Sequence, residues 1–147
     1  MSALTKPEIS SLLPHEGAMR LLDSVESWDE KTIHCRATSH RSPHNPLRHG
    51  TGLNALAGLE YAAQAMGLHV GLLNPERSTK GLIGYVGAVR DVSIRRERLD
   101  DLPGQIAIEA SRLLEGDNSL MYQFRLSADG TDIMTGRASI FLKQVAL

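Results

Sequence analysis

The sequence predicts an α+β domain in which an antiparallel sheet wraps around one long helix. Two observations carry this prediction. The segment Ala55–Leu73 is apolar on almost every face at helical length, which is typical of a buried helix. After Leu82, apolar and polar residues alternate in successive segments that are separated by turn residues, which is typical of antiparallel strands. Such a sheet needs one face covered, and the long helix can cover it.

Length and charge narrow the class of protein. At 147 residues the chain is expected to form one domain, residues 1–147, with a substantial core. The 16 basic and 17 acidic residues give a net charge of −1, so no overall field attracts nucleic acid or a membrane. Cys35 is the only cysteine, which excludes an internal disulfide and a cysteine-based zinc site.

Targeting signals and common cofactor motifs are missing from the sequence. The N-terminus lacks a basic start followed by an apolar run, so no signal peptide is expected. Glu60, Gln64 and His69 argue against a membrane span in the long helix, and we expect a cytoplasmic protein. His40 and His44 are four residues apart, but Pro43 spoils helical spacing and no carboxylate completes a metal set. No glycine-rich phosphate loop is present, so no cofactor is expected.

The N-terminal third is predicted to hold one short helix and two strands. Thr5 can cap a helix, and Glu8 three residues later completes a capping box. This helix is expected to run to about Leu13. The segments Met19–Trp28 and Thr32–Ser39 carry apolar residues at strand spacing and are predicted as the first two strands.

A long loop precedes the central helix. Ser39–Gly52 contains three of the six histidines, two prolines and two glycines, and loops of this length are often functional. Asn54 is a plausible N-cap, and Asn74–Pro75 ends the helix. Glu76–Lys80 is predicted to be a connector to the strands that follow.

The rest of the chain is predicted to be four antiparallel strands. Gly84 and Gly87 in the first of them allow bulges or close backbone contacts. The expected hairpin turns are Glu115–Asn118 and Ala128–Gly130. The expected strands are Leu82–Arg95, Gln105–Leu114, Leu120–Ser127 and Thr131–Lys143.

Glu60 is the residue that the helix pattern does not explain. A carboxylate in the most apolar helix of a small domain is costly unless it is paired or used. Gln64 lies one turn further along the same face. Glu60 and Gln64 therefore form either a buried structural network or part of a functional site.

Two motifs in this order resemble a known family. The first is Leu12-Leu13-Pro14-His15-Glu16-Gly17, followed by Leu21-Leu22-Asp23 and Val25; the second is Ala57–Gly67, with Glu60 and the Ala and Gln after it. Together they resemble the hotdog-fold dehydratases of 3-hydroxyacyl groups carried by acyl carrier protein, and most of all the divergent branch found with aryl polyene biosynthesis clusters. The resemblance implies a sheet wrapped around the helix and a dimer with two active sites at its interface.

The resemblance also implies a chemistry for Glu60. Elimination of water from a 3-hydroxyacyl thioester needs a base for the C2 proton and an acid for the departing hydroxyl group. A carboxyl group in an apolar tunnel tends to stay protonated, which suits the acid, and the family position of that carboxyl is Glu60. Free N–H groups at the helix start near Asn54 and Ala55 would stabilise the thioester oxygen, and Gln64 is expected to orient the helix and its loop.

The catalytic histidine of the family has no directly corresponding residue in this sequence. In this family it comes from the other subunit and stands in a Gly-His-Phe-Pro segment, at the position of Pro46 here. His44 lies two residues before that position and His49 three after it. We favour His49, between the loop and the helix, then His44, with His40 third. The alternative is that no histidine acts, and the chain is a partner-dependent or non-catalytic subunit.

Partners and competing functions follow from the same residues. Arg90, Arg95 and Arg96, with Arg98, form a basic patch that can dock an acidic carrier protein or can simply be a solvated strand edge. The substrate is expected to be an acyl carrier protein or coenzyme A thioester. The assembly is expected to be a homodimer or a higher oligomer of dimers, with a heterodimer as an option. The alternative functions are an acyl thioesterase on the same fold and a non-catalytic acyl-binding partner.

Overall fold

The computed structural model describes residues 3–10, 12, 17–75 and 82–144, and it confirms the predicted α+β class. Two α-helices, α1 (Lys6–Ser10) and α2 (Gly58–Leu73), and three short 3-10 helices, η1 (Gly17–Met19), η2 (Ser39–Arg41) and η3 (Ala55–Ala57), lie in this part of the chain. Its strands are β1 (Ser24–Trp28), β2 (Thr32–Ala37), β3 (Leu82–Ile94), β4 (Ile106–Glu115), β5 (Ser119–Ala128) and β6 (Thr131–Gln144).

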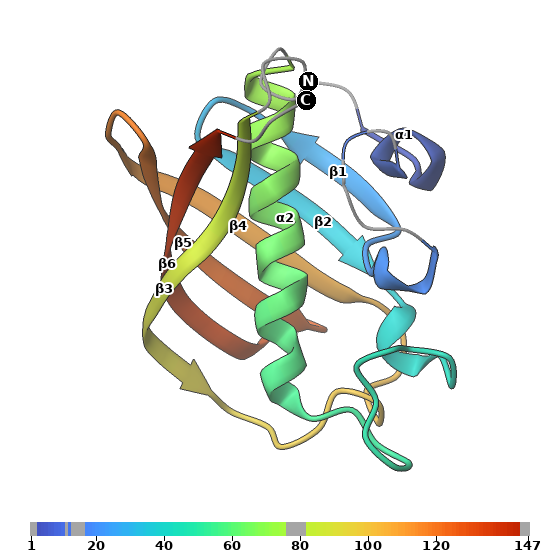
Figure 1. The fold of residues 1–147 in the computed structure, drawn as a ribbon. Coiled ribbons are helices and arrows are strands. Elements are labelled where there is room, and N and C mark those ends of the chain that lie inside the picture. Colours follow the sequence, from blue (N-terminus) through green and yellow to red (C-terminus); the bar gives the residue numbers. More distant parts are fainter. Residues whose placement is uncertain (1–2, 11, 13–16, 76–81, 145–147) are drawn as a thin grey trace.

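The strands form one antiparallel sheet in the order β1-β2-β4-β5-β6-β3. The sheet curls around α2, which runs along its concave face (Figure 1). Tyr61, Met66 and Leu68 of the helix are fully buried, as are Ile108 and Phe124 of the sheet. No helix of the described residues is long and apolar enough to cross a membrane.

The start of the helix is fixed by a cap and by a close approach to the sheet. Asn54 acts as an N-cap, but of the 3-10 turn η3 that leads directly into α2, because its Oδ1 accepts the N–H of Leu56 at 2.8 Å. Gly58 begins α2, and a Cβ atom at this position would lie 2.9 Å from Leu126 Cδ2. Glycine therefore lets the first turn of α2 lie directly against β5.

Several predicted boundaries shift. The Glu8 carboxylate accepts the N–H of Thr5 (3.3 Å), which is one half of the predicted capping box, and it also accepts the Thr5 hydroxyl (3.0 Å). The helix α1 nevertheless ends at Ser10. The expected end at Leu13 and the neighbouring Pro14, His15 and Glu16 of the first motif lie outside the described residues, as does the predicted connector Glu76–Lys80. The two hairpin turns lie where the sequence predicts them.

The prediction of a strand from Met19 is wrong at its beginning, since β1 starts at Ser24. At Leu21, side chains bind the backbone in place of a neighbouring strand. Leu21 donates its N–H to Gln64 Oε1 at 2.9 Å and accepts the hydroxyl of Ser39 at its carbonyl oxygen at 2.8 Å. The buried apolar residues of this segment therefore belong to a side-chain-bound loop.

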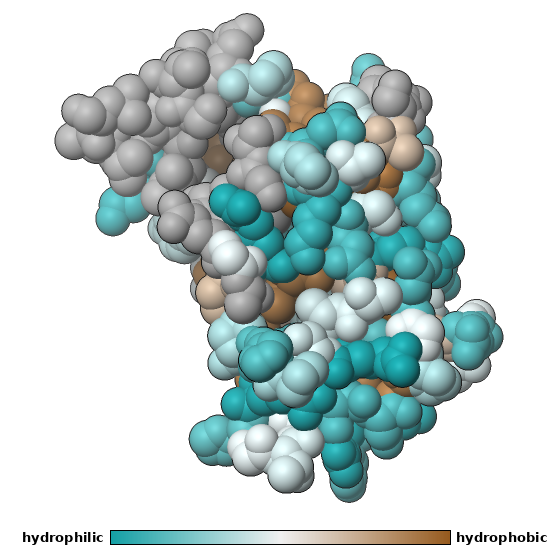
Figure 2. Space-filling model, turned by 90° about the vertical axis from the view of Figure 1, so that its right-hand side faces the viewer, coloured by the Kyte–Doolittle hydropathy of each residue, from teal (hydrophilic) through white to brown (hydrophobic). Residues whose placement is uncertain are grey.

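Strand β3 lies at one edge of the sheet and pairs only with β6 among the described residues. Its register shifts at Gly87, a predicted bulge, and again before Ser93, whereas Gly84 stays in register. A set of large apolar residues on this edge is at least 37% exposed: Tyr85, Val86, Val89, Val92, Ile94 and, on β6, Phe141. By contrast, the face that carries α1 and β1 is largely hydrophilic (Figure 2).

Candidate functional site

Glu60 and Gln64 lie on the first two turns of α2, beside the loop that leads into β1. Glu60 is half-buried, and Gln64 is 1% exposed. The Nε2 of Gln64 donates to the carbonyl of Met19 at 2.6 Å and lies 3.5 Å from Glu60 Oε1. Its Oε1 accepts the N–H of Leu21. Gln64 thus ties the loop between η1 and β1 to the helix and contacts the Glu60 carboxyl group.

A chain of hydrogen bonds fixes the segment after β2 to the same part of the helix. Ser39 donates its hydroxyl to the carbonyl of Leu21, so it accepts from the hydroxyl of Tyr61 at 2.7 Å. The Tyr61 oxygen in turn accepts the Nδ2–H of Asn45 at 3.1 Å. Tyr61 is fully buried, and burial raises the pKa of its hydroxyl. The segment from Ser39 to Asn45 is therefore held at the residue next to Glu60.

The three candidate histidines have different environments. His44 and His49 are both exposed. His49 lies in a tight turn whose backbone pairs with Gly52, and the backbone N–H of His44 donates to Ser42 Oγ at 3.1 Å. His40 is 0% exposed, and its Nε2 lies 3.0 Å from the carbonyl oxygen of Leu102.

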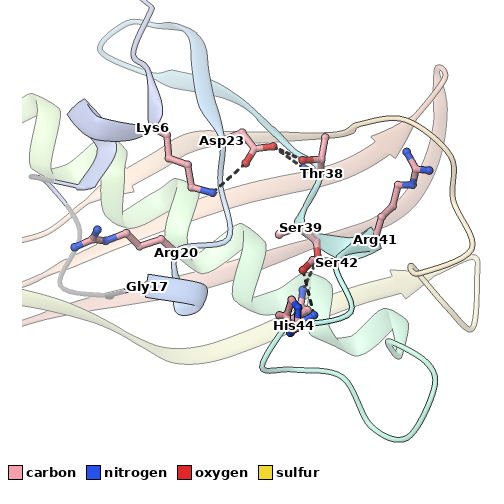
Figure 3. Close-up of a pocket in the computed structure, with 10 residues that line it drawn as sticks. Lys6, Gly17, Arg20, Asp23, Thr38, Ser39, Arg41, Ser42 and His44 are labelled. Atoms are coloured by element: carbon pink, nitrogen blue, oxygen red, sulfur yellow. Dashed lines mark hydrogen bonds and ion pairs between the residues drawn. The ribbon is translucent and has the colours of Figure 1, made fainter.

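A cavity of about 390 Å³ opens beside the segment from Ser39 to Asn45 (Figure 3). The Nζ of Lys6 lies 3.5 Å from Oδ1 of Asp23. The other oxygen of the Asp23 carboxylate accepts the N–H and the hydroxyl of Thr38 at 2.8 and 2.6 Å. Arg20 and Arg41 extend away from each other on opposite sides (Figure 3). Of the three candidate histidines only His44 lines this cavity. The lining residues are Lys6, Gly17, Arg20, Asp23, Thr38, Ser39, Arg41, Ser42, His44 and Asn45.

The expectation of free N–H groups at the helix start is wrong for Ala55 and its two neighbours. The N–H of Ala55 donates to the carbonyl of Glu97 at 2.9 Å. The N–H groups of Leu56 and Ala57 donate to the side chain and the carbonyl of Asn54, at 2.8 and 3.0 Å. These donors are used within the fold, because the segment before β4 lies against the start of the helix.

The predicted basic patch is partly neutralised. Arg90 and Arg95 are exposed, whereas Arg96 forms an ion pair with Asp101 at 2.9 Å. Arg98 pairs with Asp100, whose carboxylate also accepts the N–H of Leu53 at 2.8 Å. The Arg98 hydrogen bond and the Leu53 N–H hold the pKa of Asp100 well below its usual range. The segment therefore anchors the helix entrance as well as carrying positive charge.

Two buried groups have structural contacts. His69 Nε2 lies 2.8 Å from the carbonyl of Asp29, and its Nδ1 lies 2.6 Å from the hydroxyl of Tyr122. Burial lowers the pKa of His69. Cys35 is buried in β2, and burial raises the pKa of its thiol to about 12, so it is no nucleophile at neutral pH. Within the described residues no group of three or more His, Cys, Asp or Glu could hold a metal ion.

Solved structures with this arrangement are hotdog-fold proteins. The chain aligns with thioesterase HI1161 from Haemophilus influenzae at a TM-score of 0.69 and 13% identity, covering 98% of this chain and 94% of that one. A point mutant of thioesterase PA1618 from Pseudomonas aeruginosa aligns at a TM-score of 0.61 and 16% identity, covering 84% of this chain and 82% of that one. The predicted hotdog fold is thereby confirmed.

A third solved structure and a family model lead further. The dehydratase heterocomplex ApeI:P from Xenorhabdus doucetiae aligns at a TM-score of 0.81 and 24% identity, covering 92% of this chain and 91% of that one. The family model described as ApeP dehydratase matches residues 7–146. The chain therefore belongs to the ApeP-like dehydratase family, as the two sequence motifs indicate. No curated protein sequence matches it.

Proposed function

We propose that this protein eliminates water from a 3-hydroxyacyl thioester carried by acyl carrier protein, with coenzyme A as the alternative carrier. The observation that carries the proposal is the match of residues 7–146 to a dehydratase family. The position of Glu60 supports it, because its half-buried carboxyl group lies on the first turn of the central helix, where a side chain can act as a general acid.

The proposed reaction divides the proton transfers between two groups. Glu60 protonates the departing hydroxyl group, and a histidine of the segment from Ser39 to Gly52 removes the proton from C2. His49 and His44 are the histidines that the sequence favours, and both face solvent in the single chain. Gln64 and the hydroxyl chain through Tyr61 hold the surrounding loops on the helix.

We further propose that the working unit is a dimer that forms through β3. An exposed apolar strand edge without a partner is unfavourable in water, and five apolar side chains of β3, together with Phe141 of the adjacent β6, are at least 37% exposed. The relative from Xenorhabdus doucetiae is a dehydratase heterocomplex, so the second chain is either another copy or a different hotdog subunit. Sedimentation of the protein alone and with a co-expressed partner distinguishes the two.

The function is tested by mass spectrometry of the acyl group. The purified protein, alone and with its co-expressed partner, is incubated with 3-hydroxyacyl carrier protein and, separately, with the coenzyme A thioester. We expect loss of one water from the acyl group, with the preferred carrier reacting faster. Release of free acid would instead support a thioesterase, and binding without turnover a non-catalytic subunit.

A matched pair of variants assigns the role of Glu60. Glu60→Gln keeps size and hydrogen bonding but removes the transferable proton, so the elimination rate should fall by about 10²-fold or more. Glu26→Gln is the control, because Glu26 is exposed on β1 and pairs with Arg36 at 2.8 Å. Full activity in Glu60→Gln would refute the assignment.

A further inference from the structure

One buried side-chain nitrogen or oxygen in the described part of the chain has no hydrogen-bond partner, and it is Nδ1 of His40. Buried polar atoms in native proteins are nearly always bonded, so an exception calls for an explanation such as a bound ligand or a catalytic role. The Ser39 and Asn45 side chains on either side of it in the sequence are bonded to Tyr61. The free nitrogen is therefore a specific feature of a well-ordered segment.

The other ring nitrogen fixes the protonation of His40. Nε2 lies 3.0 Å from the carbonyl oxygen of Leu102, and a carbonyl can only accept. Nε2 therefore carries the hydrogen, and Nδ1 presents a lone pair. An imidazole with one nitrogen anchored by a backbone carbonyl and the other free to take a proton is the arrangement of an oriented general base.

His40 directly follows a residue that is hydrogen-bonded to α2. Its neighbour Ser39 bonds to Tyr61, which is the neighbour of Glu60. The charged groups that act on the ring are Arg41, Asp23 and Asp100. Both carboxylates are engaged elsewhere, Asp23 by Thr38 and Lys6 and Asp100 by Arg98 and Leu53.

We propose that His40, rather than His44 or His49, is the general base of the dehydration proposed above, on which this inference rests. The C2–H bond breaks and its proton passes to Nδ1, while its electron pair forms the C2–C3 double bond. The C3–O bond breaks, and the hydroxyl group leaves as water with the proton of the helix carboxyl group. Proton exchange with solvent then restores the neutral imidazole and the carboxylic acid.

Burial sets a condition on this step. His40 is closed off from solvent in the single chain, so substrate contact requires a shift of η2 or of the turn around Leu102. Exclusion of water suits the chemistry, because charges that develop at C2 interact more strongly in an apolar site.

Two substitutions of His40 distinguish a general base from a purely structural residue. Glutamine places an amide N–H near the position of Nε2, so His40→Gln can keep the bond to Leu102 while losing the base. Asparagine reaches only the position of Nδ1, so His40→Asn loses that bond. We expect His40→Gln to fold with nearly the wild-type melting temperature but to lower kcat by about 10²–10⁴-fold. The limb of the kcat/KM pH profile that reports protonation of the general base should also disappear. The control is His34→Gln, because His34 is a partly exposed histidine of β2.

A purely structural His40 predicts the opposite order, with His40→Gln active and His40→Asn unstable. Turnover of His40→Gln within threefold of wild type, or loss of turnover in His44→Ala or His49→Ala with His40→Gln active, would overturn the inference. A wild type without any dehydration would refute the proposed function instead. In that case nitrogen NMR still tests the role of His40. We expect an unprotonated Nδ1 whose signal shifts when a 3-hydroxyacyl pantetheine amide is added. A protonated Nδ1, or one whose signal does not shift, would overturn the assignment.

Discussion

Replacing Tyr61 by phenylalanine removes one hydroxyl group from the buried start of α2 and leaves the ring in place. Two hydrogen bonds disappear, the one that Tyr61 donates to Ser39 Oγ (2.7 Å) and the one that it accepts from Asn45 (3.1 Å). Ser39 keeps its bond to the carbonyl of Leu21, and Asn45 keeps a bond to the carbonyl of Ser39 at 2.9 Å. The change therefore weakens the attachment of the segment after β2 without opening a large cavity.

The size of the effect follows from what is left unpaired. One N–H of buried Asn45 loses its acceptor, and a buried donor without a partner costs about 1–3 kcal/mol. We therefore expect Tyr61→Phe to lower the free energy of unfolding by about 2 kcal/mol. For a chain of this length that corresponds to a drop of about 4–8 °C in melting temperature.

Urea unfolding followed by circular dichroism measures this loss, and Tyr122→Phe is the matched control. Tyr122 is also fully buried, and its hydroxyl bonds to His69, at the other end of α2. Both variants should lose stability, but only Tyr61→Phe should lower the rate of elimination at a temperature where both are folded. An unfolding free energy for Tyr61→Phe within about 0.5 kcal/mol of wild type would refute the role of the hydroxyl chain.

Two further predictions concern the scaffold. Asp100→Asn should lower the melting temperature at neutral pH. Since the pKa of Asp100 is depressed in the folded protein, the difference in melting temperature from wild type should shrink as the pH falls below about 4. A difference that stays constant in acid would contradict the role of the Leu53 and Arg98 contacts. Gly136→Ala should cost about 1–3 kcal/mol, because the added Cβ would lie 2.7 Å from Cζ of buried Phe124. Gly71→Ala, which meets nothing closer than 3.9 Å, should be neutral or stabilising, and equal effects of the two alanines would argue against the packing of β6.

Local patterns in the sequence were sufficient for most of the fold. Strand alternation, hairpin turns and the Asn54 cap depend on neighbours in the chain, and the structure has them within a few residues of the predicted positions. The false strand start at Met19 has a non-local cause. Leu21 is held by Gln64 and Ser39, which lie 43 and 18 residues further along the chain, and apolar spacing alone does not reveal such partners.

The site was harder to predict for the same reason. Glu60 stood out because a carboxylate interrupts an apolar helix, which is a local signal. The carbonyl of Leu102 that anchors His40 is 62 residues away in sequence, so nothing near His40 indicates that it is buried. Likewise, the N–H of Ala55 is occupied by Glu97 from a segment that a reading of the helix start alone does not include.

The proposed reaction removes water across C2 and C3 of an acyl thioester, with Glu60 as the acid. The reverse reaction in water enriched with heavy oxygen tests this proposal, starting from the enoyl carrier protein and the assembled protein. We predict one heavy oxygen in the hydroxyl group at C3, and none with Glu60→Gln. Heavy oxygen found instead in the carboxyl group of a released free acid would contradict the account and identify a thioesterase.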